Sequence, residues 1–261
     1  MENTRDSVIL INNMHPFFED YNFFGFVHRG GDEEKTENTL EAFQYSSDLG
    51  FVFMETDVQS TLDGKVVIFH DETLERVAGI NKKVSQLTFQ EIKKIDLING
   101  GKIPSLEETL SSFPNLRFNI DIKVDSAVKE TLKIIKQNNA FDRVCLAAFS
   151  TKRLNLIRRL AGPELCSSMG QAEIVRLLLN SFGLKLRISS GMCAQVPVSQ
   201  FGITIISNRF VKKVHALNKL IHVWTIDEKE EMFRLIDLGV DGLMTDKPTV
   251  LKKAMLERNL F

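Results

Sequence analysis

The sequence has 261 residues, of which 43% are hydrophobic and 26% are charged, and this length suffices for one large domain with a full core. Its 33 Lys and Arg residues balance 34 Asp and Glu residues, so the formal net charge of -1 gives no global field toward nucleic acid or anionic lipid. No segment approaches the roughly 18 apolar residues that span a bilayer, and the apolar run Val8–Ile11 is too short for a signal peptide. We therefore expect a cytoplasmic protein that binds no nucleic acid and makes no stable membrane insertion.

In the first half of the chain, segments with a period of two alternate with segments of helical period. Strands are predicted over Phe24–His28, Phe51–Val58, Lys65–Phe69 and Arg117–Lys123. Helices are predicted over Asn38–Leu49, Thr88–Ile95, Ser105–Phe113 and Ser126–Gln137. Asn38 or Thr39 is suited to cap the first helix, and Ser105 with Glu108 has the spacing of a capping box.

The second half repeats this alternation. Strands are predicted over Val144–Phe149, Leu165–Met169, Ile221–Ile226 and Gly242–Thr245, with one more over either Cys193–Val196 or Ile203–Ser207. Helices are predicted over Thr151–Leu160, Ala172–Phe182, Phe210–Leu220, Lys229–Leu238 and Thr249–Arg258. The three Cys residues lack metal-site spacing and predict buried, reduced thiols.

About eight strand–helix units in a chain of this length are typical of a (β/α)8 TIM barrel. An open doubly wound sheet is the structural competitor, but no Gly-rich dinucleotide fingerprint follows the first strand. Residues 72–104 are less periodic and indicate a small insertion after the second strand. We therefore expect residues 1–261 to form a single barrel domain; the sequence does not indicate the oligomeric state.

The carboxyl ends of barrel strands supply active sites, and several acidic residues fall at these ends. Glu55 and Asp57 are two apart on a strand and therefore face the same way, and Asp121 occupies a similar place on the strand from Arg117. Three carboxylates at one mouth suit Mg²⁺ or Ca²⁺. The alternative is that they form structural ion pairs with Arg29 and Lys123.

The five His residues differ in their setting. His28 and His70 each end an apolar run, and their position near the three acids favours a general acid/base pair. His15 and His215 are expected at the solvated surface, and His222 falls at the opposite end of the barrel. Trp224 either packs on the substrate or fills the barrel core.

These residues resemble the motifs of the glycerophosphodiester phosphodiesterase family, in order and through most of the chain. The matching motifs are His28–Arg29–Gly30, Glu37–Asn38–Thr39, Glu55–Thr56–Asp57, His70–Asp71, Ile103–Glu108, Asn119–Lys123, Val223–Thr225, Gly239–Gly242 and Thr245–Pro248. Thr36, Asp121, Ala148 and Asp227 depart from the residues that are common in the family at their positions. Asp121 replaces the commoner Glu, which shortens that ligand by one methylene.

The resemblance implies a TIM barrel with a small insertion and a divalent-metal enzyme. Such an enzyme hydrolyses glycerophosphodiesters to an alcohol and sn-glycerol 3-phosphate. By motif position, the implied roles are metal ligation by Glu55, Asp57 and Asp121, acid/base catalysis by His28 and His70, and phosphate contact by Arg29 and Lys123. Whether water or the glycerol 2-hydroxyl attacks, which His is the base, and what Glu37 does stay open.

Three alternative functions are compatible with a barrel of this kind. A related enzyme that acts on lysophospholipids or sphingomyelin needs a wide apolar groove leading to the site. If this chain has such a groove, we expect residues 72–104 to form it. A binding protein on the same barrel is disfavoured because all the acid/base and metal residues are present. An unrelated metal-dependent barrel enzyme, such as an aldolase, is disfavoured by the ordered motifs.

Overall fold

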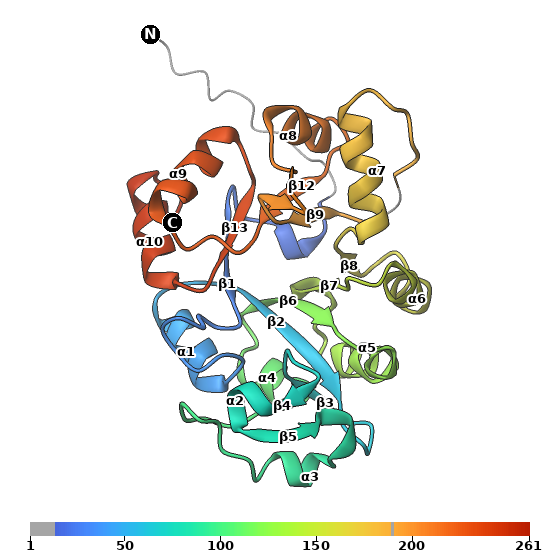
Figure 1. The fold of residues 1–261 in the computed structure, drawn as a ribbon, viewed down its shortest axis with the longest axis vertical. Coiled ribbons are helices and arrows are strands. Elements are labelled where there is room, and N and C mark those ends of the chain that lie inside the picture. Colours follow the sequence, from blue (N-terminus) through green and yellow to red (C-terminus); the bar gives the residue numbers. More distant parts are fainter. Residues whose placement is uncertain (1–13, 189–190) are drawn as a thin grey trace.

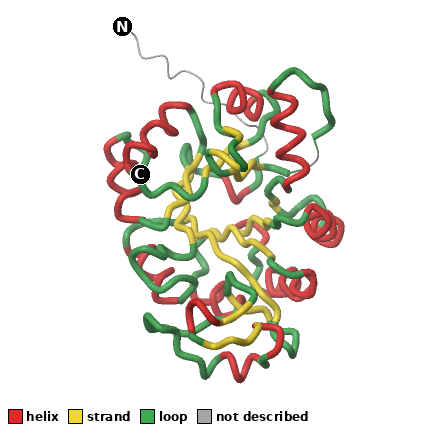
Figure 2. Tube along the Cα trace, viewed as in Figure 1, coloured by secondary structure: helices red, strands yellow, loops and turns green. Residues whose placement is uncertain are grey.

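The computed structural model describes residues 14–188 and 191–261, so the run Val8–Ile11 lies outside the described part. Eight parallel strands form the sheet at its centre (Figures 1 and 2). They are β1 (Phe24–His28), β2 (Phe53–Ser60), β6 (Arg117–Ile122), β7 (Val144–Ala147), β8 (Cys166–Ser167), β9 (Cys193–Val196), β12 (Leu220–Val223) and β13 (Gly242–Thr245).

The strands follow one another around a ring in the order β8-β7-β6-β2-β1-β13-β12-β9. An isolated parallel bridge between Ser168 and Cys193 joins the two ends of this path. Two backbone hydrogen bonds support the closure, from Met169 N to Cys193 O and from Met192 N to Ser167 O, each 2.8 Å long. The predicted (β/α)8 barrel is therefore confirmed.

Helices follow the strands and lie outside the ring (Figure 1). They are α1 (Leu40–Asp48), α4 (Leu106–Ser112), α5 (Val128–Gln137), α6 (Thr151–Ala161), α7 (Gln171–Ser181), α8 (Asn208–His215), α9 (Lys229–Leu238) and α10 (Pro248–Glu257). The Thr39 and Ser105 hydroxyls accept from the third backbone amide beyond them, Ala42 N and Glu108 N, and so cap α1 and α4. Short 3-10 turns add η1 (Pro16–Phe18), η3 (Asp125–Ala127) and η4 (Phe141–Arg143).

The barrel floor is aromatic. Phe17 and Phe18 of η1 are buried against Phe24 and Phe26 of β1, so the segment before β1 packs into the amino-terminal end of the barrel. The three Cys residues lie in the same cluster and are buried and free, as predicted. His222 is also fully buried there, which agrees with a structural place away from the strand tips.

The structure supplies the partners of two predicted strand segments. The segment Lys65–Phe69 contains only β3 (Val66–Ile68), which pairs antiparallel with β2 and is not a barrel strand. The ambiguous pair resolves in favour of β9, whereas Ile203–Thr204 (β11) forms a small antiparallel hairpin with Ser199–Gln200 (β10). Period-two patterns alone do not specify the partner, and a two-residue strand buries too little to be distinguished in sequence.

The segment predicted as an insertion leaves the barrel after β3. It contains β4 (Thr73–Leu74), α2 (Glu75–Ala78), β5 (Ile80–Lys83), η2 (Val84–Gln86) and α3 (Phe89–Ile92). Leu74, Val84 and Ile92 bury their side chains in a small cluster of their own, together with Val67 and Phe69 of the β3 region. This packing fixes the segment beside one side of the barrel mouth.

Candidate active site

All eight residues predicted for the site line one cavity of about 480 Å³ at the carboxyl ends of the strands. They are His28, Arg29, Glu55, Asp57, His70, Asp121, Lys123 and Trp224. Strand register explains the convergence, because Glu55 on β2 lies beside His28 on β1, and Asp57 on β2 lies beside Asp121 on β6. Residues separated by more than ninety positions in sequence therefore face one mouth.

Each of the two site His residues is held by a carboxylate. The Nδ1 atom of His28 lies 2.6 Å from Asp246 Oδ1, and the Nδ1 atom of His70 lies 2.6 Å from Asp71 Oδ1. A ring fixed through Nδ1 leaves Nε2 for exchange of a proton with a bound molecule. The sequence did not assign this part to either Asp, although Asp71 and Asp246 both stand in motifs that matched.

The electrostatic setting of His28 favours its charged form. Burial works against a charged imidazole, but the carboxylates of Glu55 and Asp246 outweigh it and raise the pKa of His28 to about 9. Its Nε2 atom lies 3.6 Å from Glu55 Oε2. Burial and the nearby charge of Asp57 in turn raise the pKa of Glu55 to about 7.

Two cations stand among the carboxylates. Lys123 Nζ lies 2.7 Å from Asp57 Oδ1 and 2.7 Å from Asp121 Oδ2, and Arg29 Nε lies 3.4 Å from Asp57 Oδ2. Lys123 and Arg29 overcome the effect of burial and lower the pKa of Asp57, whereas burial raises the pKa of Asp121. The ion pairs predicted as the alternative to a metal site are therefore present, but they leave some carboxylate oxygens of the site without a partner.

Two carboxylate oxygens at the site are buried and have no hydrogen-bond partner among the described residues: Glu55 Oε2 and Asp121 Oδ1. A buried carboxylate oxygen without a donor is costly unless a cation or ligand reaches it. Within residues 14–188 and 191–261, no group of three or more acidic, His or Cys side chains is close enough together to hold an ion as arranged. Glu55, Asp57 and Asp121 nonetheless form an all-oxygen donor set of the kind that Mg²⁺ or Ca²⁺ prefers.

The turn after β1 places Arg29 at the site. Arg29 has a left-handed backbone with φ 52°, and Gly30 and Gly31 follow with φ 82° and 99°. A Cβ on Gly30 would lie 2.7 Å from the Cβ of Ala42, so α1 packs too closely for a larger residue. Glycine at this position lets the chain reverse and aim the Arg29 side chain at Asp57.

Glu37 links the loop after β1 to the insertion. Its carboxylate accepts from Arg76 Nη1 at 2.5 Å and Nη2 at 2.8 Å, and Arg29 Nη1 lies 3.4 Å away. Arg76 also donates from Nε to Asp71 Oδ2 at 2.7 Å, so one guanidinium ties Glu37 to the carboxylate that holds His70. Arg76 was missed in the sequence because it belongs to the weakly periodic insertion and to none of the matching motifs.

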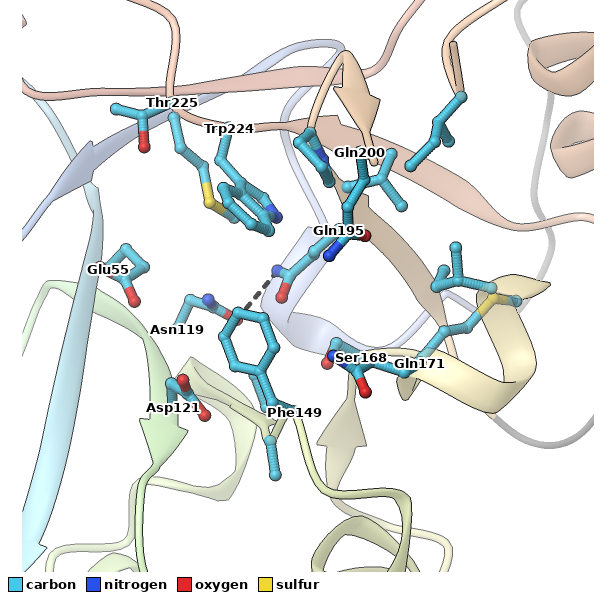
Figure 3. Close-up of a pocket in the computed structure, with 18 of the residues that line it drawn as sticks. Glu55, Asn119, Asp121, Phe149, Ser168, Gln171, Gln195, Gln200, Trp224 and Thr225 are labelled. Atoms are coloured by element: carbon cyan, nitrogen blue, oxygen red, sulfur yellow. Dashed lines mark hydrogen bonds between the residues drawn. The ribbon is translucent and has the colours of Figure 1, made fainter. Parts of the chain in front are cut away.

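The rest of the cavity is mainly apolar and lies away from the acids. Figure 3 shows Glu55 and Asp121 toward one end of the cavity and Gln171 and Gln200 toward the other. Trp224 lies between them with its ring centroid 6.1 Å from that of Phe149. The apolar wall is formed by residues of α7, the β10–β11 hairpin and adjoining loops, including Ile174, Val175, Leu178, Pro197, Phe201, Ile203 and Ile205.

Residues 72–104 contribute nothing to this wall among the described lining residues, contrary to the condition set for a lipid substrate. The helix at α7 was predicted, but its place in the cavity wall, like that of the hairpin, was not, because exposed apolar positions on a helix look like core positions. Gln195 was also missed in the sequence, and it donates from Nε2 to Asn119 Oδ1 at 3.0 Å across the cavity floor (Figure 3).

Comparison with known proteins places this chain in a family. The model of the "Glycerophosphoryl diester phosphodiesterase family" matches residues 28–250. The chain is 35% identical over 238 residues to "Probable glycerophosphodiester phosphodiesterase 2" of Mycobacterium tuberculosis, covering 89% of this chain and 90% of that protein. It is 30% identical over 266 residues to lysophospholipase D GDPD1 of Homo sapiens, covering 86% of this chain and 83% of that protein.

Among solved structures, a phosphodiesterase of Oleispira antarctica in complex with the product sn-glycerol-3-phosphate superposes with a TM-score of 0.75. It is 20% identical and the match covers 89% of this chain and 96% of that one, so it supports the fold. The family model and the relatives together decide the assignment. The chain belongs to the glycerophosphoryl diester phosphodiesterase family and is an enzyme of the phosphodiesterase class.

Proposed function

We propose that the protein hydrolyses glycerophosphodiesters to an alcohol and sn-glycerol 3-phosphate, with His28 and His70 as its acid/base pair. The observation that carries the proposal is the pair of His–Asp contacts, each 2.6 Å long, at one cavity that also holds buried carboxylates and two cations. Family membership and the product bound to the Oleispira antarctica phosphodiesterase support the choice of substrate.

The two imidazoles are suited to proton transfer at opposite ends of the scissile bond. With Nδ1 committed to Asp246 or Asp71, each ring exchanges its proton at Nε2. One Nε2 takes the proton of the attacking hydroxyl and the other delivers a proton to the departing oxygen. General acid/base help of this kind contributes about 10²–10⁴-fold to rate.

Lys123 and Arg29 are placed to neutralise the phosphodiester. Both cations line the cavity and already sit against Asp57, so their charges point at the same region of the floor. A phosphate oxygen that displaces one carboxylate contact keeps each cation paired. Trp224 offers an apolar face between this region and the wall, where we place the glycerol or the alcohol group.

The chemistry of the donor set fits a divalent cation, Mg²⁺ or Ca²⁺, held by Glu55, Asp57 and Asp121. The buried orphan oxygens of Glu55 and Asp121 are the structural observation behind this fit. When bound, such an ion neutralises phosphoryl oxygens as a Lewis acid.

A second substrate class is favoured by the apolar wall. A lysophospholipid carries the same glycerophosphodiester core with one acyl chain, and the wall along α7 and the β10–β11 hairpin offers a place for that chain. The relative named lysophospholipase D GDPD1 supports this candidate. Hydrolysis at the same bond then releases the head-group alcohol and a lysophosphatidic acid.

The test measures product release by the wild type and two variants. His28→Ala and His70→Ala should each reduce glycerol 3-phosphate release from glycerophosphocholine by about 10²-fold or more. His215→Ala, on α8 away from the cavity, is the matched control and should retain activity. EDTA should inactivate the wild type, with Mg²⁺ or Ca²⁺ restoring it.

Retained activity in either site variant contradicts that residue's role, and indifference to EDTA contradicts the metal. Activity measured on a panel of substrates with different head groups, including lysophosphatidylcholine, separates the two substrate classes.

We also propose that residues 1–261 act as one catalytic domain with the insertion at about 72–104. Within the described residues no helix is long and apolar enough to span a bilayer. We further propose a cytoplasmic location for this chain.

A further inference from the structure

Basic charge is concentrated in one part of this nearly neutral chain. Residues 151–226 contain eleven Lys and Arg residues and two acidic residues, a formal net charge of +9, although the whole chain carries -1. One of the two acids, Glu173, is buried and paired with Arg158. The segment spans α6, α7 and α8, which follow one another around the barrel (Figure 1), and the uncharged β10–β11 hairpin between α7 and α8 in sequence.

Several of these basic side chains are exposed and lack an ion-pair partner. Arg176, Lys185, Arg187 and Arg209 are all exposed, and none has an acidic group within 4.0 Å in the part of the chain that the structure describes. The unpaired cations here are available to an external anionic surface.

Large apolar side chains are exposed among these cations. On α7, Val175 is 56% exposed, and Leu179 and Phe182 follow at four and seven positions further, which is one face of a helix. Phe182 is 66% exposed, and the guanidinium of Arg209 lies 4.8 Å from its ring centroid. An apolar stripe thus runs along the outer face of α7 and ends beside an unpaired cation.

The β10–β11 hairpin extends this stripe across the cavity mouth. Phe201 is 95% exposed and Ile203 is 58% exposed, and both line the catalytic cavity, as Val175 does. Leu184 and Leu186 add exposed apolar groups that alternate with Lys185 and Arg187 along the chain. A monomeric protein seldom exposes so many large apolar groups in one region unless something covers them.

We propose that this surface docks on an anionic phospholipid membrane. The interfacial surface comprises the outer stripe of α7, the loop 182–187, the hairpin tip and Arg209. Its apolar groups enter the boundary between head groups and acyl chains, and its cations contact lipid phosphates, the pattern that peripheral membrane proteins use. The cavity then opens at the membrane, because Val175, Phe201 and Ile203 belong to both the surface and the cavity wall.

The positive charge of this surface favours a membrane over a second copy of this chain as its partner. Two copies that meet through this face bring two unpaired cationic patches together, which is unfavourable. An anionic bilayer neutralises the same charges and covers the apolar groups at once. The docking surface stands apart from the proposed reaction, since vesicle binding needs no turnover.

The test is co-sedimentation of the full chain with vesicles. Vesicles of phosphatidylcholine mixed with phosphatidylglycerol should bind the wild type more tightly than vesicles of phosphatidylcholine alone, and added salt should weaken the binding. Phe182→Ser with Phe201→Ser should lower the affinity roughly tenfold or more. Lys185→Ser with Arg187→Ser should lower it roughly fivefold for each charge removed.

The matched control is Leu256→Ser, because Leu256 is 52% exposed on α10, outside the interfacial surface. It should bind vesicles as the wild type does, and thermal unfolding checks that all variants are folded. His28→Ala should also bind normally, so that a failure of the proposed catalysis is seen separately in glycerol 3-phosphate release. Absence of binding to anionic vesicles, binding that neither surface variant weakens, or loss of binding in His28→Ala would overturn the proposal. A dimer that the Phe double variant converts to monomer would also overturn it.

Discussion

His222 should make the stability of the barrel depend on pH. Its ring is fully buried among Phe18, Phe24 and Phe26, with centroid distances of 5.7, 5.4 and 4.8 Å. Neither ring nitrogen has a hydrogen-bond partner among the described residues. Burial therefore lowers the pKa of His222 from 6.5 to about 3.

The direction and size of the effect follow from linkage. Between pH 6.5 and 3 the unfolded chain binds a proton at this His and the native state does not, so the free energy of unfolding falls as the pH falls. The loss is about 1.4 kcal/mol per pH unit, which makes about 2.7 kcal/mol at pH 4.5 relative to pH 7.5. Above pH 6.5 both states are neutral at this position and the contribution is flat.

The assay is urea unfolding of the wild type and His222→Phe at pH 7.5 and 4.5. The larger Phe ring has a packing cost of its own, but that cost is the same at both pH values. The wild type should therefore lose about 2–3 kcal/mol more than the variant on acidification, after other titrating groups cancel in the difference. Equal losses in the two proteins would refute the reasoning.

His215 provides a comparison of opposite sign. It pairs with Asp241 at 2.9 Å, and this hydrogen bond raises its pKa despite partial burial. A raised pKa contributes stability below pH 6.5 that is lost as the pH rises through the folded value. On acidification, His215→Gln should therefore lose more stability than the wild type, whereas His222→Phe should lose less.

Two further predictions concern the site and the barrel. Asp246→Asn should reduce kcat for glycerophosphocholine about 10²-fold in a protein that still folds, because His28 loses the carboxylate at its Nδ1. The exposed Asp237→Asn is the control, and a fall in kcat of less than about threefold in Asp246→Asn would count against the orienting role. Gly242→Ala should lower the free energy of unfolding by about 2–3 kcal/mol in urea, because its Cβ would lie 2.5 Å from Phe24 O. In Gly170→Ala the nearest neighbour is the flexible Leu154 side chain at 3.2 Å, so a loss as large there would contradict the packing argument.

The barrel could be predicted because its strands are short apolar runs that alternate with helices. The bounds of Phe24–His28, Gly242–Thr245 and Lys229–Leu238 agree with the structure residue for residue. The short strand predicted at Lys65–Phe69 is present as Val66–Ile68, but its antiparallel pairing with β2 was not predicted, because alternation does not reveal the direction of a partner. The choice between Cys193–Val196 and Ile203–Ser207 needed the neighbouring strand β12, which only the fold supplies.

The site residues could be predicted from the strand ends, but the contacts that support them could not. His28, Glu55 and Asp121 share a cavity because strand order places β1, β2 and β6 side by side. Asp246 reaches His28 from the far end of the chain, and Arg76 reaches Glu37 from the insertion. Pairings of this kind depend on side-chain direction and loop conformation, which periodicity does not encode.

The net charge of the whole chain does not describe the charge of its parts. A net charge of -1 describes the field far from the molecule, yet charges act on a nearby surface within a Debye length of about 8–10 Å. Residues 151–226 carry a formal net charge of +9, so a surface that faces this segment meets more basic than acidic groups. The same segment holds the apolar run Leu177–Leu179, where a barrel helix needs only one apolar face. An excess of positive charge and a run of apolar residues therefore occur in the same part of the sequence. This coincidence distinguishes the proposed membrane-facing surface from an ordinary basic surface.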